Sequence, residues 1–343
     1  TTQIGGGNGG AATPTVGLTG YDQTGAPAMS VLVPQGTTLI PLTASGQANP
    51  AFKVEVNNGR AVKASIVGGT SLQLQSNDVN GGRAGLRITE TTSGSVRYVG
   101  VRVKDAAGAT PGFPKYVSMG VVSEDAEADL DMFNSFGTGD KNRYVDNRYI
   151  YLNGGPINGW WTWSNVPGER ARKYVRESLK MGAIPTFVWY NIPDGGESYT
   201  TDLEHIQDRA YMKAYFELLR DTLAIFNEEA KDETIMMVME PDFLGYMMQL
   251  SGKTPEQIQA FASAARDAGL WTAADPTYPD TLPGLVSTIN HIIKRDAPQV
   301  RFGWQFNVWA SLDGSVNAPN APKSLMKVTD GDQQGWTNGR KTI

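Results

Sequence analysis

The stretch Met237–Tyr246 reads MVMEPDFLGY. It contains the end of an apolar run that starts near Thr234, and two acidic residues follow this run directly. An unbroken apolar run of this length is typical of a strand that is buried on both faces. Glu240 and Asp242 stand on either side of Pro241, where such a strand would leave its sheet. Two interpretations follow for these carboxylates: they form a catalytic site at a strand end, or they belong to a salt-bridged loop.

Further apolar runs follow Pro114 and alternate with amphipathic segments. The predicted strands are Tyr116–Val122, Arg148–Leu152, Ile184–Tyr190, Thr234–Met239, Leu270–Ala274 and Val300–Val308. Repeated strand–helix units predict a parallel sheet with right-handed crossovers. We therefore predict a TIM-like barrel over residues 113–343, complete, distorted or incomplete, with an open doubly wound sheet as the alternative.

The helices between these strands have recognisable ends. One is predicted to end at Gly182, and another to run from the capping box Thr201-x-x-Glu204 to about Ala230. A third is predicted to open at Thr254 and a fourth to cover Leu282–Asp296.

Residues 15–112 show a different pattern, in which short runs alternate apolar and polar residues. The runs are Met29–Val33, Thr38–Leu42, Phe52–Val56, Ser71–Gln75, Gly85–Thr89 and Val96–Val103. Gly and Asn turn signals separate them at roughly 8–12 residues, which is typical of an antiparallel β-sandwich. The region resembles bacterial immunoglobulin-like modules, and residues 1–14, which are rich in Gly and Thr, are predicted to be a linker.

The composition argues against several classes of protein. The net charge is −5 and no basic stripe is present, so nucleic acid is not expected as a partner. The chain has no cysteine, which excludes thiolate catalysis, and its two histidines, His205 and His291, are too few for a multi-His metal site. No apolar stretch reaches about 18 residues, so no membrane span is expected. We expect a monomeric, secreted protein whose signal peptide has been removed, without a cofactor or a metal.

Polar and aromatic residues follow the predicted strands, at the edge where parallel barrels build their active sites. These residues are Asn153, Tyr190, Asp194, Glu240, Asp242, Asp275, Tyr278, Gln305, Asn307 and Trp309. The carboxylates Glu240, Asp242, Asp194 and Asp275 are the candidates for acid–base chemistry. The amides and aromatic rings are candidates for binding a substrate.

All eight tryptophans lie after residue 159, and Trp160, Trp161 and Trp163 crowd into one loop that follows a predicted strand. Aromatic faces in a cleft suit sugar rings, because the axial C–H groups of a pyranose make one side of the ring apolar. We expect this trio to bind a sugar. For Trp189 two interpretations remain open, a substrate contact and a place in the core.

Carboxylates and aromatic platforms without His or metal motifs indicate glycoside hydrolysis of a polysaccharide or oligosaccharide. The reaction needs one protonated acid for the leaving oxygen and one ionised carboxylate for water or direct attack. Burial or a neighbouring like charge can raise the pKa of one acid, which divides these roles.

Two short motifs resemble glycoside hydrolase family 6, the inverting cellulases on a distorted barrel. Met237–Leu244, MVMEPDFL, is similar to the strand-end motif of that family, and Tyr190–Asp194, YNIPD, to its Y-D-L-P-D segment. The resemblance implies hydrolysis of a β-glucan such as cellulose by inversion, with Asp242 as general acid and Glu240 as its support. The chain departs from the family pattern at Asn191, at the Gly-Gly pair after Asp194 and in lacking a late motif for the base.

Two other functions fit the same residues. One is a non-catalytic carbohydrate-binding or surface adhesion protein on a barrel scaffold. The other is a Ca²⁺- or Mg²⁺-dependent hydrolase that uses Asp194, Asp242 and Asp275, since these cations prefer oxygen ligands.

Overall fold

We describe the protein from a computed structural model, which covers residues 15–23, 26–124 and 144–305. Among these residues the chain divides into two compact units. The first holds the chain up to residue 120 together with residues 144–146 and 176–183, and the second holds residues 121–124, 147–175 and 184–305. Each unit is described by itself.

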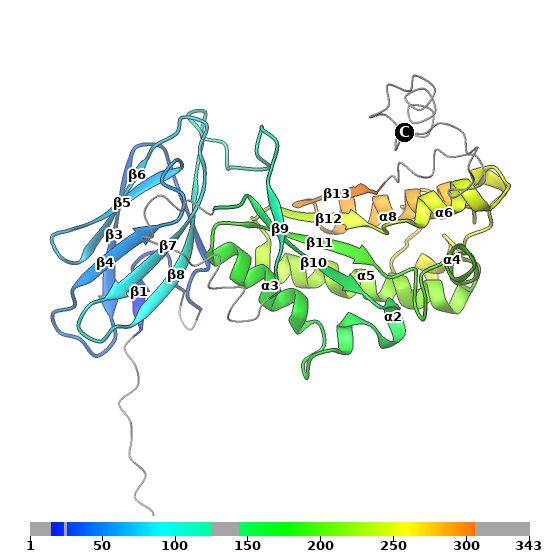
Figure 1. The fold of residues 1–343 in the computed structure, drawn as a ribbon, viewed down its shortest axis with the longest axis horizontal. Coiled ribbons are helices and arrows are strands. Elements are labelled where there is room, and N and C mark those ends of the chain that lie inside the picture. The colour runs from blue at the N-terminus through cyan, green and yellow to red at the C-terminus, as the bar shows by residue number, and fades with distance from the viewer. Residues whose placement is uncertain (1–14, 24–25, 125–143, 306–343) are drawn as a thin grey trace, which may run out of the picture. The chain divides into compact units, whose positions relative to one another are not determined.

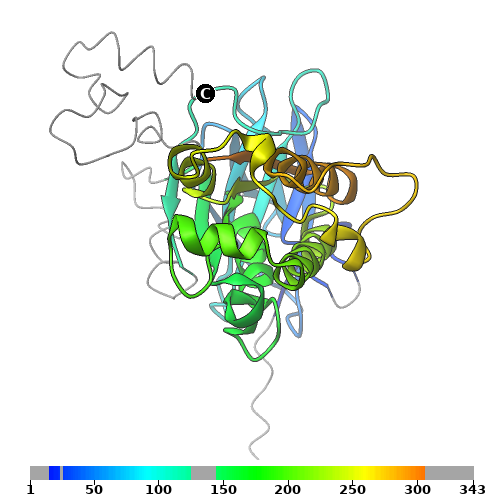
Figure 2. The same ribbon diagram turned by 90° about the vertical axis from the view of Figure 1, so that its right-hand side faces the viewer.

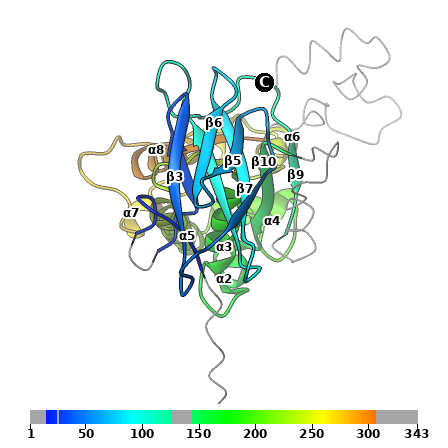
Figure 3. The ribbon, with the colours of Figure 1, turned by 90° about the vertical axis from the view of Figure 1, so that its left-hand side faces the viewer.

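The first unit contains two four-stranded sheets. One sheet has the order β1 (Val16–Leu18), β3 (Thr37–Ala44), β6 (Ser71–Ser76) and β5 (Val62–Val67). The other has the order β2 (Ser30–Val33), β8 (Val96–Val103), β7 (Gly82–Glu90) and β4 (Phe52–Val56). In Figure 3, β3, β6 and β5 lie side by side. All neighbours are antiparallel except β2 and β8, which run parallel.

Alternation along the strands produces a single core between the two sheets. In β3, Ile40, Leu42 and Ala44 are buried while the residues between them are exposed. The opposite sheet contributes Leu86, Val99 and other apolar side chains to the same cluster. Because successive side chains of a strand point to opposite faces, the alternation in β3 gives that strand one packed and one exposed face. In the other sheet β7 is buried along nearly all of its length, and residues 179–181 lie against Gly85 and Gly100. The predicted β-sandwich is thus confirmed, although β1 and β5 were not among the predicted strands.

An ion pair joins Asp22, which follows β1, to Arg97 on β8. The Arg97 guanidinium donates to both carboxylate oxygens of Asp22 at 2.6 Å, and the backbone N–H groups of Leu18 and Ala28 donate to the same carboxylate at 2.7 and 2.9 Å. Burial by itself would raise the pKa of Asp22, but these hydrogen bonds and the charge of Arg97 lower it to about 2. Asp22 is therefore a carboxylate whose ionised form is fully compensated.

The second unit is built on a five-stranded sheet whose order follows the chain. The order is β9 (Gly120–Val122), β10 (Asn147–Asn153), β11 (Ile184–Tyr190), β12 (Ile235–Met239) and β13 (Val300–Trp304) (Figure 1). From β10 to β13 all neighbours are parallel. A doubly wound sheet would reverse its order at a switch point, and the described strands show no such reversal. In the described part of the chain the sheet remains open, and no closed barrel is formed.

Helices connect the parallel strands. The helices α2 (Gly155–Asn158) and α3 (Glu169–Lys180), with the 3₁₀ turn Trp160–Thr162, lie in sequence between β10 and β11. Between β11 and β12 come α4 (Tyr199–Ile206) and α5 (Arg209–Ala230). Between β12 and β13 come α6 (Phe243–Leu250), the 3₁₀ turn Pro255–Gln257, α7 (Ala264–Asp267) and α8 (Leu282–Asp296). In Figure 2, α4 and α6 lie in front of the strand ends.

Three local predictions need correction. The long helix predicted from Thr201 is two helices, because Ser198 caps α4 by accepting from the Thr201 N–H, and Asp208 caps α5. The capping box at Thr254 exists but opens only a 3₁₀ turn. The strand predicted at Leu270–Ala274 is absent. There the Asp275 carboxylate accepts from the N–H and the hydroxyl of Thr272, and such local bonds favour a turn over a strand.

Candidate active site

The strand ends of the second unit lie at a common edge. Asn153 pairs in register with Tyr190, and Trp189 pairs with Met239. The Glu240 N–H donates to the Trp189 carbonyl at 2.7 Å, so the acidic stretch leaves the sheet beside the end of β11. Parallel pairing therefore brings three predicted site segments together, those that follow β10, β11 and β12.

Glu240 is buried and holds the loop after β11. Its carboxylate accepts from the N–H groups of Asn191 and Ile192 at 3.1 and 3.0 Å, and from the Tyr215 hydroxyl at 2.9 Å. Tyr215 in turn accepts from the Trp189 indole N–H at 2.9 Å. Burial raises the pKa of Glu240 to about 8, against the effect of these donors. These hydrogen bonds tie the end of β12 to the loop after β11.

The backbone around Pro241 is strained. Glu240 has φ 39° and Asp242 has φ 67°, and they are the non-glycine residues in the described chain with positive φ. The left-handed region costs an L-residue about 1 kcal/mol or more, and such strain concentrates at functional sites. Asp242, which is partly exposed, precedes α6 directly. The strain therefore singles out the same two carboxylates that the sequence pattern indicates.

Several contacts brace the YNIPD loop from other elements. The Tyr211 hydroxyl, from α5, donates to the carbonyls of Asn191 and Ile192 at 2.8 and 3.0 Å. The His205 ring stacks on Tyr211, with 3.9 Å between ring centres, and its Nδ1 lies 2.7 Å from the Ile192 carbonyl. This histidine, which the sequence interpretation left outside the site, supports it structurally.

Asp194 lies against the loop that follows β10. A Cβ atom added to Gly155 would collide with the Asp194 carboxyl group, and Gly155 also has φ 77°. Glycine is therefore required at this position for two reasons, the close approach and the positive φ. Asp194 and the end of β10 thus belong to the same edge as Asp242.

The structure adds a carboxylate that the sequence interpretation missed, Asp202 on α4. It is fully buried, and neither of its carboxylate oxygens has a hydrogen-bond partner in the described part of the chain. Burial and then the charges of Glu197 and Asp242 raise the pKa of Asp202 to about 7. Since α4 contacts α6, Asp202 lies on the element next to Asp242. A polar residue in the first turn of an amphipathic helix carries no signal that could have identified it.

Tyrosines surround these acids. Burial first, and then the charges of Glu197 and Asp242, raise the pKa of Tyr190 well above its ordinary value, and the same two charges add to the effect of burial on Tyr246. Tyr151 meets Tyr190 edge to face with 6.4 Å between ring centres. The edge therefore combines the carboxylates Glu197 and Asp242 with aromatic surface.

The tryptophan trio separates into buried and exposed rings. Trp160 is fully buried and meets Trp189, itself fully buried, edge to face. Trp161 is partly buried against Trp160. Trp163 is 53% exposed, and the Arg170 guanidinium lies 5.4 Å from its ring centre. Of the four, Trp163 has the largest area available to a ligand, while Trp160 and Trp189 belong to the core in this structure.

The remaining predicted residues lie elsewhere or beyond the described chain. Asp275 follows no strand, and its carboxylate contacts His291 and Arg295 at 2.8 and 2.9 Å, so its prediction as a strand-end acid is wrong. The hydrogen bonds from Thr272 and His291 hold its pKa below the ordinary range. Tyr278 lies beside Trp271. Gln305 follows β13, and Asn307 and Trp309 fall outside the described residues.

The described residues contain neither a cluster of metal-ligating side chains nor a membrane-spanning helix. No group of three or more His, Asp or Glu side chains there has the geometry to hold a metal ion. No helix in the same part of the chain is long and apolar enough to cross a membrane.

Comparison with known proteins gives partial likenesses only. No family model and no curated protein matches the chain. The titin M3 domain is similar over 22% of this chain and 91% of its own, with 15% identity and a TM-score of 0.17. A protein of Bacteroides fragilis assigned as an alpha-galactosidase is similar over 74% of this chain and 49% of its own, with 11% identity and a TM-score of 0.23. EndoBT-3987 of Bacteroides thetaiotamicron, solved with a Man9GlcNAc2Asn substrate, is similar over 84% of this chain and 69% of its own, with 8% identity and a TM-score of 0.26.

Proposed function

We propose that the second unit is a glycoside hydrolase that cleaves a β-linked polysaccharide, such as a β-glucan, by inversion. Asp242 is the general acid. The observation that carries this assignment is the strained Glu240–Asp242 turn, which follows a strand of the parallel sheet. Near it is the buried carboxyl group of Asp202, which has no hydrogen-bond partner among the described residues. Such strain persists only where the surrounding structure imposes it.

The two acids of the turn have different roles. Glu240 is enclosed by donors from Asn191, Ile192 and Tyr215, so it fixes the turn relative to the β11 loop. Asp242 is partly exposed and can reach a leaving-group oxygen. The rigid placement of Asp242 is what a proton transfer requires, because the donor must lie within hydrogen-bond reach of its target.

Asp202 supports acid catalysis through charge. Burial and the charges of Glu197 and Asp242 raise the pKa of Asp202 to about 7, so Asp202 holds its proton up to near neutral pH. General acids of glycosidases need such a raised pKa, because a carboxylic acid with its ordinary pKa is ionised at neutral pH. Asp194, across the edge, is the candidate that orients the attacking water.

The aromatic residues suit a sugar chain. Trp163 and Tyr151 are the exposed aromatic residues of the β10 strand and its loop, and Tyr190 stands at the end of the neighbouring β11. An apolar pyranose face can stack on such rings while its hydroxyl groups meet the acids. A polysaccharide is too large to enter a cell, so we place the reaction outside the cell.

The test is reducing-end release from a panel of β-glucans and other polysaccharides, with NMR of the first product to read its anomeric configuration. Asp242→Asn should lower kcat by about 10²- to 10⁴-fold, the contribution of one general acid. Asparagine is chosen because it tolerates positive φ, so the turn is preserved. Glu204→Gln, on the exposed side of α4, is the control and should leave activity unchanged.

Two results would contradict the proposal. The first is an Asp242→Asn protein with wild-type activity on every glycan that the chain cleaves. The second is binding of glycans without the release of any reducing end, which would indicate the carbohydrate-binding alternative. Loss of activity in a chelator, with recovery on adding Ca²⁺ or Mg²⁺, would indicate the metal-dependent hydrolase.

A further inference from the structure

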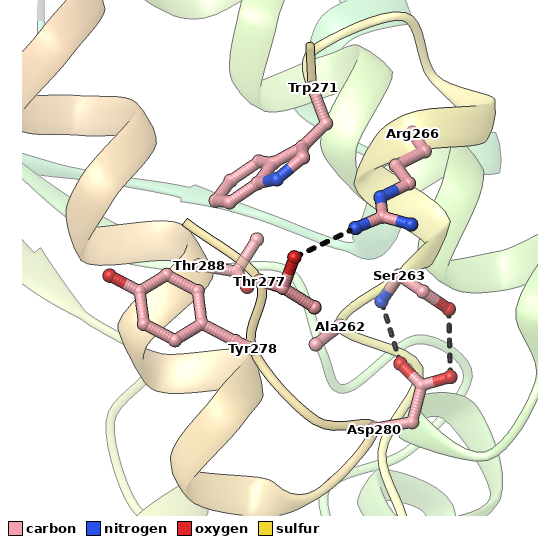
Figure 4. Close-up of a pocket in the computed structure, with 8 residues that line it drawn as sticks. All are labelled: Ala262, Ser263, Arg266, Trp271, Thr277, Tyr278, Asp280 and Thr288. Atoms are coloured by element: carbon pink, nitrogen blue, oxygen red, sulfur yellow. Dashed lines mark hydrogen bonds between the residues drawn. The ribbon is translucent and has the colours of Figure 1, made fainter. Parts of the chain in front are cut away.

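A cavity lies away from the strand ends, between α7, the segment that follows it and α8 (Figure 4). Its volume is about 190 Å³. The lining residues that matter chemically are Ser263, Arg266, Trp271, Thr277, Tyr278 and Asp280. None of them belongs to the acids or aromatic rings assigned above to catalysis.

The cavity is held in shape by bonds beneath it. The Trp271 indole N–H donates to the Pro276 carbonyl at 3.0 Å, which fixes the orientation of the ring. Asp275, at the centre of the segment, is held by Thr272, His291 and Arg295. A loop braced from α8 in this way is preorganised, which lowers the entropy lost on binding.

The lining combines an aromatic surface with one donor group and one acceptor group. Trp271 and Tyr278 meet edge to face, with 5.9 Å between ring centres. Arg266 is exposed, and within the described residues its guanidinium reaches only the Thr277 hydroxyl, at 3.5 Å, and no carboxylate. Opposite it, the Asp280 carboxylate accepts from the N–H and the hydroxyl of Ser263, both at 2.7 Å, and keeps further acceptor capacity.

This combination suits one neutral sugar ring. Drug-sized ligands occupy cavities of roughly 300–1,000 Å³, so this smaller cavity suits a single ring. An aromatic face packs on the apolar side of a pyranose, while Arg266 can donate to its hydroxyl groups and Asp280 can accept from them. The charges of Arg266 and Asp280 offset each other, which favours a neutral ligand over a sugar acid.

We propose that the α7–α8 cavity binds the end or a single unit of a glycan as a non-catalytic site. Trp271 stacks on the ring, Arg266 donates to it and Asp280 accepts from it. Because the proposal depends on other residues than the hydrolase assignment, either can fail without the other.

The experiment titrates the full chain, carrying Asp242→Asn, with D-glucose, D-galactose, D-mannose, D-xylose and D-glucuronate. The readout is the indole N–H signal of Trp271 in protein NMR, assigned from a Trp271→Phe variant. At least one neutral sugar should shift this signal, with a Kd on the order of 1 mM. D-glucuronate should bind more weakly than that sugar.

Variants then test the chemistry of the site. Arg266→Gln should weaken binding about tenfold or more, since hydrogen bonds to charged groups are the strong ones. Arg301→Gln, an exposed arginine on β13 with a backbone partner, should leave binding unchanged. Trp271→Ala should abolish the response of the other cavity signals, and a cooperative thermal transition checks that the variant is folded.

The proposal is overturned if no neutral sugar moves the Trp271 signal at concentrations on the order of 100 mM. It is also overturned if Arg266→Gln binds as the wild type does, or if D-glucuronate binds more tightly than every neutral sugar.

Discussion

Asp22 in the sandwich and Asp202 at the sheet edge are the same residue type in opposite surroundings. Asp22 meets a bidentate arginine and two backbone N–H groups, and its pKa falls to about 2. Asp202 meets no donor in the described chain and stands near two further acids, and its pKa rises to about 7. Asp22 is partly exposed and Asp202 is fully buried, and burial acts to raise the pKa of both, so the available partner decides the direction of the shift.

The difference separates a carboxylate whose ionised form stabilises the fold from one whose ionised form destabilises it. The free energy of unfolding increases when an ionised acid is better compensated in the folded state, and decreases when it is worse compensated. The first unit therefore gains stability from Asp22, whose ionised form is compensated by Arg97 and two backbone N–H groups. The second unit gives up stability at its edge, which is what a site for acid catalysis requires.

The largest effect is expected from Asp202→Asn. The folded pKa of Asp202 lies above its unfolded value of 3.8, so its proton is lost from the folded state only as the pH rises to about 7. The contribution of Asp202 to the free energy of unfolding is thus complete below pH 4 and falls by about 4 kcal/mol as the pH rises to 7 and above. Asparagine resembles the protonated carboxyl group and cannot ionise, so the variant should be about 4 kcal/mol more stable than the wild type at pH 8 and similar at pH 4.

Urea unfolding followed by tryptophan fluorescence measures this effect, because all eight tryptophans lie after residue 159. Glu204→Gln, two residues along α4 and exposed, serves as the control and should unfold as the wild type does at both pH values, because it retains Asp202. If the wild type and Asp202→Asn have the same free energy of unfolding at pH 8, ionised Asp202 does not destabilise the fold and the difference from Asp22 is wrong.

Asp22→Asn should lower the free energy of unfolding, and by less than Asp202→Asn raises it. The folded pKa of Asp22 lies below 3.8, so its contribution is complete above pH 4 and is lost as the pH falls to about 2. The variant should be less stable than the wild type by about 2 kcal/mol at pH 7 and should approach it near pH 2. Hydrogen exchange of the strand amides between residues 16 and 103 reports on this unit.

A second ion pair of the sandwich supplies the control. Arg87 and Glu55 lie 3.1 Å apart with partly exposed side chains, so Glu55→Gln should cost about 1 kcal/mol at most. If Glu55→Gln and Asp22→Asn speed the hydrogen exchange of these amides equally, the Asp22–Arg97 pair stabilises the sandwich no more than the Glu55–Arg87 pair does.

The smallest effect concerns the aromatic rings at the sheet edge. Trp163→Ala should raise KM roughly two- to tenfold with kcat unchanged, because a stacking ring contributes about 0.5–1.5 kcal/mol to binding. Trp163→Phe should restore most of the affinity. An unchanged KM for the alanine variant would show that substrate does not reach this ring.

Much of the sandwich follows from local pattern. The six predicted runs all become strands, because alternation with period two requires only neighbouring residues to be known. The strand β5, VKASIV, was missed because Lys63 and Ser65 make it too polar to stand out. In the second unit, the predicted strands correspond to β10, β11, β12 and β13, and the helix α8 was also predicted. A fifth strand, β9, covers only the end of its predicted range.

Errors occur where a local side chain competes with the pattern. Leu270–Ala274 has the apolar content of a strand, yet Asp275 and Thr272 close a turn there. Within Thr201–Ala230 the helical pattern is continuous, but Asp208 accepts from the N–H groups of Ala210 and Tyr211 and starts a new helix. Each outcome depends on two local hydrogen bonds to one carboxylate, which hydrophobic periodicity does not record.

The sequence by itself determined where strands and turns lie and that acids follow the strand Ile235–Met239, since these features depend on residues close together in the chain. Only the tertiary structure decided which acids are compensated. The properties of Asp202, Glu240 and Asp22 depend on burial and on partners far away in sequence. Desolvation and charge act through space, and for this reason the fold and not the motif distinguishes an acid that stabilises from an acid that is poised to react.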